Sequence, residues 1–119
     1  MESDLNKNKL VLFVDDDDDF REMLGELLEL DDVKVVLSSS TKDAKEKILE
    51  INPDLLITDL NLPDGNGLDL SKYFKEKCPR GSVIMLTGEI DLDISDSFVD
   101  RVFQKPFGID VLINTIESF

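Results

Sequence analysis

The sequence predicts an α/β fold, in which a doubly wound parallel sheet of five strands is covered by helices on both faces. Two observations lead to this prediction. Short apolar runs alternate with longer amphipathic segments along the 119 residues, without repeats, low-complexity segments or linkers. The runs are also nearly continuous, as expected for strands buried on both faces of a parallel sheet. We therefore expect a single domain over residues 1–119.

Five apolar runs are strand candidates because they are short and rich in aliphatic residues. They lie at residues 10–14, 33–37, 55–58, 83–86 and 102–104. Four of these runs are followed by the polar residues Asp15, Asp59, Thr87 and Lys105.

The segments between these runs carry apolar residues at helical spacing. The stripes lie at residues 20–28, 44–51, 70–74 and 109–116. Asp19 is a candidate N-cap of the first helix, and Ser40 or Thr41 of the second. Residues 62–67 predict a loop, whose two glycines are free to adopt positive φ.

The composition excludes several classes of partner. Thirteen basic and twenty-seven acidic side chains give a net charge of −14, which repels nucleic acid and anionic membrane surfaces, so neither is expected as a direct partner. No segment approaches the roughly 20 apolar residues that span a bilayer, and no signal-peptide run is present. The single cysteine, Cys78, excludes an internal disulfide. We therefore expect a soluble protein of the cytoplasm.

In a parallel sheet of this kind, ligands bind at the carboxyl ends of the strands. Asp15, Asp16, Asp59, Thr87 and Lys105 are therefore expected to converge at one edge. Crowded carboxylates attract a hard cation such as Mg²⁺. Taken singly, these residues have ordinary explanations, since acidic runs are often solvated and Asp or Thr often follows a strand in a turn. Their joint occurrence at four strand ends favours a site.

Four motifs, in this order, resemble those of the receiver domain of two-component response regulators. They are Val14-Asp15-Asp16-Asp17, Thr58-Asp59-Leu60-Asn61-Leu62-Pro63-Asp64-Gly65-Asn66-Gly67, Met85-Leu86-Thr87-Gly88 and Gln104-Lys105-Pro106-Phe107. The resemblance covers essentially the whole chain and implies a flavodoxin-like (βα)₅ fold with strand order 2-1-3-4-5. We expect residues 1–119 to form one receiver domain, with residues 1–8 as a flexible arm.

The resemblance implies that Asp59 accepts a phosphoryl group in a Mg²⁺-dependent reaction. Asp16 and Asp59 would bind the ion directly and Asp15 partly through water. The backbone carbonyl of Asn61 would be a further ligand.

The same resemblance assigns the two remaining strand ends. The Thr87 hydroxyl would donate a hydrogen bond to the phosphoryl group, and the Lys105 ammonium would form a salt bridge with it. The Lys105–Pro106 peptide would be cis.

The expected partners also follow from the resemblance. The chain has no histidine, so the phosphohistidine donor must be a sensor histidine kinase or histidine phosphotransfer protein. The output is conformational and acts on a downstream target protein or output domain. A receiver catalyses only its own phosphorylation and dephosphorylation, so no further enzyme activity is expected. The chain resembles a single-domain regulator or a fragment of a longer one. Asn61 and Glu89 resemble the pair found in chemotaxis-type regulators, which predicts a short-lived phosphoryl group.

Three alternative functions fit parts of the sequence. A pseudo-receiver would keep the fold and signal without phosphate, but the set of site residues is complete. A haloacid-dehalogenase-like phosphatase could use residues 15–17 as its Asp-x-Asp motif, yet the residues that should follow this motif differ and a later acidic metal motif is missing. A flavodoxin would need a hydroxyl- and glycine-rich phosphate loop where residues 15–19 are all aspartate.

The sequence departs from the family between Thr87 and Lys105. Receivers usually carry Tyr or Phe three residues before the lysine, where this chain has Val102. Phe103 should point to the opposite face of its strand, so it cannot replace that ring. Residues 89–99 are short and rich in Asp and Ser, so we expect a shortened or irregular fourth helix. We expect output to depend on shifts of this segment without an aromatic rotamer switch.

Overall fold

The computed structural model describes residues 9–89, 92–95 and 97–119. Its centre is a five-stranded sheet of order β2-β1-β3-β6-β7, and every neighbouring pair is parallel. The strands are β1 (Leu10–Val14), β2 (Lys34–Ser38), β3 (Leu55–Asp59), β6 (Ser82–Thr87) and β7 (Arg101–Gln104). This order confirms the predicted doubly wound sheet. The expected arm at residues 1–8 lies outside the described residues.

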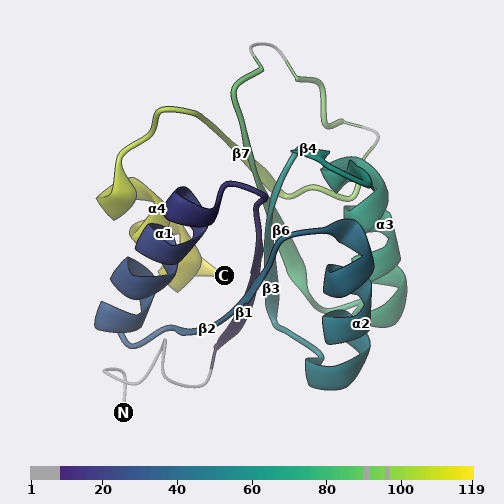
Figure 1. Cartoon of the computed structure of the whole chain (residues 1–119), viewed down its shortest axis with the longest axis horizontal. Helices are drawn as coiled ribbons and strands as arrows, with labels where there is room; N and C mark the ends of the chain where they lie inside the picture. Colours follow the sequence, from purple (N-terminus) through teal and green to yellow (C-terminus); the bar gives the residue numbers. More distant parts are fainter. Residues whose placement is uncertain (1–8, 90–91, 96) are drawn as a thin grey trace.

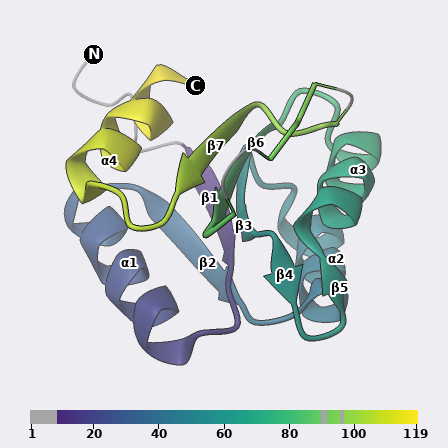
Figure 2. The ribbon, with the colours of Figure 1, turned by 90° about the horizontal axis from the view of Figure 1, so that it is seen from above.

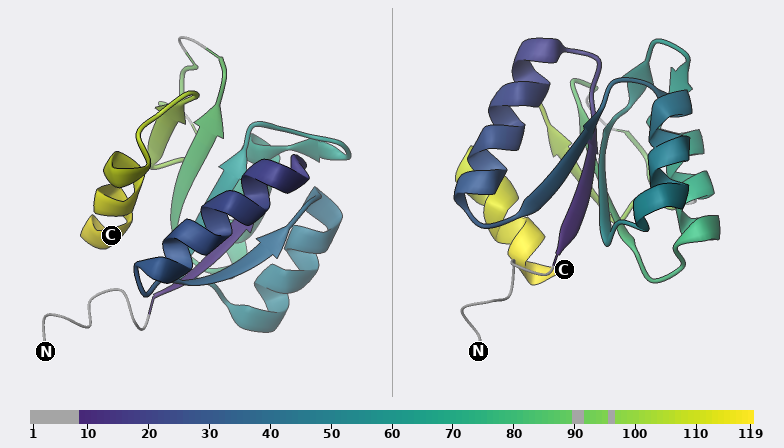
Figure 3. Two further views of the ribbon diagram at one scale, coloured as in Figure 1. Left: turned by 60° about the vertical axis from the view of Figure 1, so that its left-hand side comes forward. Right: turned by 60° about the horizontal axis from the view of Figure 1, so that its bottom comes forward.

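In the part of the chain that the structure describes, four helices cover the two faces of the sheet (Figure 1). They are α1 (Asp18–Leu30), α2 (Thr41–Ile51), α3 (Gly67–Lys77) and α4 (Ile109–Ser118). Helices α1 and α4 lie on one face, and α2 and α3 lie on the other, as the right view of Figure 3 shows. None of the described helices has both the length and the apolar character needed to cross a bilayer.

The core is split by the sheet into two apolar layers because strands β1, β3 and β6 are buried on both faces. Alternate residues of β1 go to opposite layers: Leu12 packs in the α2–α3 layer and Phe13 in the α1–α4 layer. Both side chains are fully buried. The same alternation sends Val102 to the first layer and Phe103 to the second, which confirms that these two side chains face opposite ways.

Side chains cap three of the helices at their N-termini. The Asp17 carboxylate accepts the Phe20 N–H at the start of α1, so the expectation that Asp19 caps this helix is wrong. Asp17 itself has an extended backbone, and the helix begins at Asp18, two residues before the apolar stripe that starts at Phe20. Ser40 caps α2, as predicted, and Asn66 caps α3.

The loop after β3 contains a small antiparallel hairpin, β4 (Asn61–Leu62) with β5 (Gly65–Asn66), which is visible beside α3 in Figure 2. Neither Gly65 nor Gly67 has a positive φ, so neither uses the conformational freedom that glycine offers. Gly67 is required for a close approach instead. A Cβ at this position would lie 2.3 Å from the backbone oxygen of Asp59.

The segment between β6 and β7 has no helix among its described residues, 88–89, 92–95 and 97–100. A turn in which the Ser97 N–H donates to the Ile94 oxygen at 3.0 Å replaces it, and Leu92 and Ile94 pack against the α2–α3 layer. This confirms the predicted irregularity, because local Asp and Ser hydrogen bonds compete with a helix. Residues 90, 91 and 96 of this segment lie outside the described residues.

Candidate functional site

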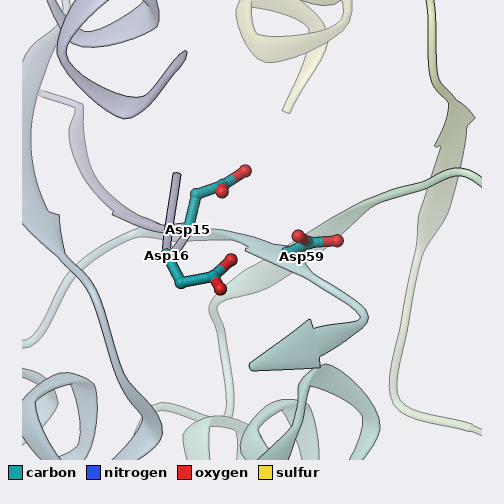
Figure 4. Close-up of side chains that lie close together, drawn as sticks. All are labelled: Asp15, Asp16 and Asp59. Atoms are coloured by element: carbon teal, nitrogen blue, oxygen red, sulfur yellow. The ribbon is translucent and has the colours of Figure 1, made fainter. Parts of the chain in front are cut away.

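Three carboxylates meet at the carboxyl end of the sheet (Figure 4). Asp15 and Asp16 follow β1, and Asp59 ends the adjacent β3, whose Thr58 pairs with Val14. One carboxylate oxygen from each of the three residues lies within 4.8 Å of the other two. Asp15 is fully buried, Asp59 is partly buried and Asp16 is exposed. The predicted convergence is therefore present.

Asp15 is held from several sides although it is a fully buried acid. Its Oδ1 accepts the Asp17 N–H at 2.9 Å, and its Oδ2 lies 3.3 Å from the Lys105 ammonium. Its backbone N–H donates to the Ser38 oxygen, and the Arg21 guanidinium donates to its carbonyl oxygen at 2.7 Å. A buried carboxylate needs such partners because desolvation opposes its charged form.

Asp59 presents one oxygen to each of two partners. The Leu60 N–H donates to Oδ1 at 2.8 Å, and the Lys105 ammonium lies 3.5 Å from Oδ2. Burial raises the pKa of the Asp59 carboxyl, and the negative charge of Asp15 adds to this, while Lys105 and the Leu60 N–H partly offset it. Lys105 therefore compensates the negative charge of the three carboxylates only in part, and the remaining charge favours a cation at this edge.

Lys105 reaches the acids from the loop that follows β7. Its backbone N–H donates to the Thr87 oxygen at 2.7 Å, which continues the β6–β7 pairing. The Lys105–Pro106 peptide is cis, as the resemblance implied. The ammonium lies 4.9 Å from the ring centroid of Phe20. Sequence reasoning missed this contact, because Phe20 stood out only as a member of the α1 apolar stripe.

Thr87 ends β6, next to β3, and is nearly fully buried. Its Oγ1 accepts the Glu89 N–H at 3.0 Å. A hydroxyl has one proton to donate and two lone pairs, so this contact leaves the proton free for another acceptor. Gly88, the next residue, has no atom within 4 Å of the place where a Cβ would be. The surface beside Thr87 is therefore open.

The β3–α3 loop shapes the remaining side of the site. Asn61 is exposed at the start of β4, two residues after Asp59. The Gly67 N–H donates to the Leu60 oxygen at 2.7 Å. The Asp64 carboxylate accepts the N–H groups of Thr41 and Lys42 at 2.8 and 3.0 Å, in the first turn of α2. Sequence reasoning missed these hydrogen bonds between Asp64 and the start of α2. The one feature of the sequence that could have indicated them is an acidic residue in a tight loop.

The donor set fits Mg²⁺. The three side chains supply oxygen ligands only, as this hard cation prefers. The exposed carboxylate of Asp16 leaves a solvent-facing side, which suits an ion that usually keeps several waters. Among the described residues, these three acids are the one group with metal-binding spacing.

Comparisons with known proteins agree on the family. Residues 11–117 match the model of the response regulator receiver domain. The response regulator protein PilR of Pseudomonas aeruginosa is 38% identical over 82 residues, which are 69% of this chain and 18% of PilR. The transcriptional regulator NtrC of Proteus hauseri is 32% identical over 90% of this chain and 24% of its own length. The receiver protein CpdR of Brucella abortus is 31% identical, over 92% of this chain and 95% of CpdR.

Solved structures have the same fold. A CheY-like receiver domain protein from Methanospirillum hungatei has a TM-score of 0.87 and 25% identity, over 92% of this chain and 91% of its own. A receiver domain protein from Clostridium thermocellum has a TM-score of 0.85 and 27% identity, over 92% of both chains. The chain spans 18% of PilR and 24% of NtrC, so the likeness to these two concerns one part of each.

Proposed function

The chain belongs to the response regulator receiver domain family, and from this premise we propose that Asp59 accepts a phosphoryl group from another protein. The observation that carries the proposal is the meeting of Asp15, Asp16 and Asp59 beside Lys105 at one edge of the sheet. The donor is a phosphohistidine of a sensor histidine kinase or phosphotransfer protein. The chain itself contains no histidine.

The transfer requires an oxygen of the Asp59 carboxylate to attack phosphorus in line with the phosphorus–nitrogen bond of the donor. A phosphorus–oxygen bond forms, the phosphorus–nitrogen bond breaks, and its electron pair stays on the imidazole nitrogen. A carboxylate is a weak nucleophile, so positioning and charge neutralisation supply most of the rate. The hydrogen bond from Leu60 to Oδ1 fixes the carboxylate plane.

Asp15, Asp16, Asp59 and the Asn61 carbonyl are the proposed ligands of Mg²⁺. When bound, the ion supplies positive charge against the three carboxylates and the incoming phosphoryl oxygens. The three carboxylate oxygens within 4.8 Å of one another support the acidic part of this ligand set, and the Asn61 carbonyl is included from the family resemblance.

Thr87 and Lys105 are the proposed partners of the phosphoryl oxygens. The free proton of the Thr87 hydroxyl can be donated to one oxygen, and the Lys105 ammonium already lies beside Asp59. Both contacts gain strength as negative charge builds up on the phosphoryl group in the transition state.

The proposed output is a conformational change that regulates a downstream protein or an attached output domain. Two kinds of relative support it: NtrC is named a DNA-binding transcriptional regulator, and LuxN of Vibrio campbellii, 28% identical over 96% of this chain, is named a sensor kinase/phosphatase. In both, the matched region is a small share of a longer protein.

Labelling with acetyl phosphate tests the function. Intact-mass measurement should show one added phosphoryl group, in the presence of Mg²⁺ and not after chelation. Asp59→Asn should abolish it, and Asp69→Asn, which removes an exposed acid from the first turn of α3, should not. Equal labelling of wild type and Asp59→Asn would refute the assignment. No labelling of either would favour a receiver that signals without phosphate.

A further inference from the structure

The Lys105 ammonium has three neighbours among the described residues: two carboxylates and one aromatic ring. It lies 3.3 Å from Asp15, 3.5 Å from Asp59 and 4.9 Å from the ring centroid of Phe20. Both ion pairs are longer than the roughly 2.7–2.9 Å of a strong charge-assisted hydrogen bond. The carboxylates alone therefore leave the ammonium loosely placed. A ring centroid within about 6 Å is close enough for a cation–π contact.

The Phe20 ring is itself held on two sides. It packs edge-to-face against Phe13, with centroids 6.0 Å apart, and against Phe107, with centroids 6.3 Å apart. Phe13 is fully buried in β1, so one support of the ring belongs to the centre of the sheet. Phe107 lies between Lys105 and α4 and packs in turn on Phe103 of β7. A ring with two fixed neighbours presents a fixed face to the ammonium.

We propose that Phe20 is a positioning residue for Lys105: its ring face holds the ammonium beside Asp15 and Asp59, ready for the phosphoryl group. This rests on the proposed phosphoacceptor role of Asp59. A lysine has four rotatable bonds and keeps considerable freedom at a surface, and the Lys105 side chain is 31% exposed. The ring reduces the space that this side chain samples.

The Lys105 ammonium lies against the Phe20 ring in this structure, and it would have a second position once a phosphoryl group is present on Asp59. The ammonium is attracted to the ring less strongly than to an oxyanion, because a cation–π contact lacks the full opposite charge. Phosphoryl oxygens on Asp59 would therefore draw the ammonium away from Phe20. The ring would then lose its cation while keeping its edge-to-face contacts with Phe13 and Phe107.

A spectroscopic measurement on the unphosphorylated protein tests the contact directly. The Lys105 ammonium lies over the ring face, so the protons on the carbon next to it should resonate upfield of ordinary lysine values. Phe20→Leu should return them to ordinary values, and Phe20→Tyr should keep the upfield shift. Phe103→Leu is the matched control, because it removes a ring of the same aromatic group that has no described contact with Lys105. Addition of beryllofluoride to wild type should reduce the shift.

A kinetic measurement tests the consequence. The rate of labelling by acetyl phosphate should fall by about two- to thirtyfold in Phe20→Leu, the range expected for loss of a cation–π contact. Magnesium affinity should be unchanged, Phe20→Tyr should restore the rate, and Phe103→Leu should keep it. General damage to the fold would instead lower magnesium affinity and labelling together.

Either of two results would overturn the proposal. One is a Lys105 signal that is the same in wild type and Phe20→Leu, or that moves as far in Phe103→Leu. The other is a normal labelling rate, or a lowered magnesium affinity, in Phe20→Leu. Failure of the phosphoacceptor assignment would look different, because Asp59→Asn would then still be labelled while the upfield shift persisted in unphosphorylated protein.

Discussion

Gly67 shows how one missing side chain allows the site to form. It begins α3 directly behind Asp59, and a Cβ there would lie 2.3 Å from the Asp59 backbone oxygen and 2.9 Å from the Met85 methyl carbon. Backbone cannot move aside as a flexible side chain does, so the β3–α3 loop would have to shift. That loop carries Asn61, a proposed metal ligand.

Gly67→Ala is therefore expected to destabilise the fold by about 1–3 kcal/mol, the usual cost of overpacking a tight position. Chemical denaturation measures it. Gly88→Ala is the matched control, because a Cβ at Gly88 would meet no atom within 4 Å and should leave stability nearly unchanged. Equal effects of the two substitutions would show that the close approach at Gly67 does not limit stability.

At the scale of elements, the β4–β5 hairpin is tied to α2 through Asp64. Its carboxylate accepts the N–H groups of Thr41 and Lys42 at the positive end of the helix. These two hydrogen bonds lower the pKa of Asp64 below its usual value. A carboxyl with a lowered pKa in the folded state stabilises the fold above its unfolded pKa, and this contribution is lost as the pH falls through the folded value.

Asp64→Asn should thus lower the thermal midpoint at neutral pH, where the wild-type carboxylate is ionised. The difference between the thermal midpoints of wild type and variant should narrow as the pH falls below about 4, the ordinary pKa of aspartate. Thermal unfolding followed by circular dichroism over this pH range measures it. Glu46→Gln, an equal loss of charge on the exposed side of α2, should show no such narrowing. A gap that stayed constant down to pH 2 would contradict the ionic origin of the bridge.

The elements were predictable where one local rule decided them. The residues of β3 before Asp59 are all buried. A nearly continuous apolar run of this length is typical of a strand that is covered on both faces of a parallel sheet, so the sequence predicts this strand. The N-cap of α1 was not predictable from the sequence. Five consecutive aspartates are equivalent candidates for the cap, and only the path of the chain after β1 selects Asp17. The Phe20–Lys105 contact joins residues 85 positions apart in sequence, and no local pattern encodes such a pairing.

The acids of the candidate site were predictable for a topological reason. Asp15 and Asp59 each follow an apolar run, and adjacent parallel strands bring their carboxyl ends together whatever the loops do. Gly65 and Gly67 do not use the positive φ open to glycine: Gly65 pairs with Leu62 in the hairpin, and Gly67 begins α3. Glycine reports either backbone freedom or a close approach, and the sequence does not separate the two.

Over the whole molecule, the net charge of −14 makes every cation stabilising to some degree. A specific effect of Mg²⁺ must therefore be separated from general screening. The repulsion between the acidic side chains weakens as ionic strength rises, whatever the cation. The three carboxylates within 4.8 Å give the site its own contribution, since they come together only in the folded state. A ligand that binds only the folded state at one hundred times its dissociation constant adds about 2.7 kcal/mol.

Mg²⁺ is therefore expected to raise the thermal midpoint of wild type above the value in NaCl of equal ionic strength. Asp16→Asn should lose most of this excess, because it replaces one of the three carboxylates with a neutral amide, whose oxygen attracts Mg²⁺ much less strongly. Asp19→Asn is the matched control: it removes the same charge three residues further on, from an exposed acid outside the group, and should keep the excess. Because both variants relieve the same amount of net charge, their response to NaCl should be alike. If both lost the excess equally, Mg²⁺ would be acting on the acidic surface as a whole and the proposed ligand set would be wrong.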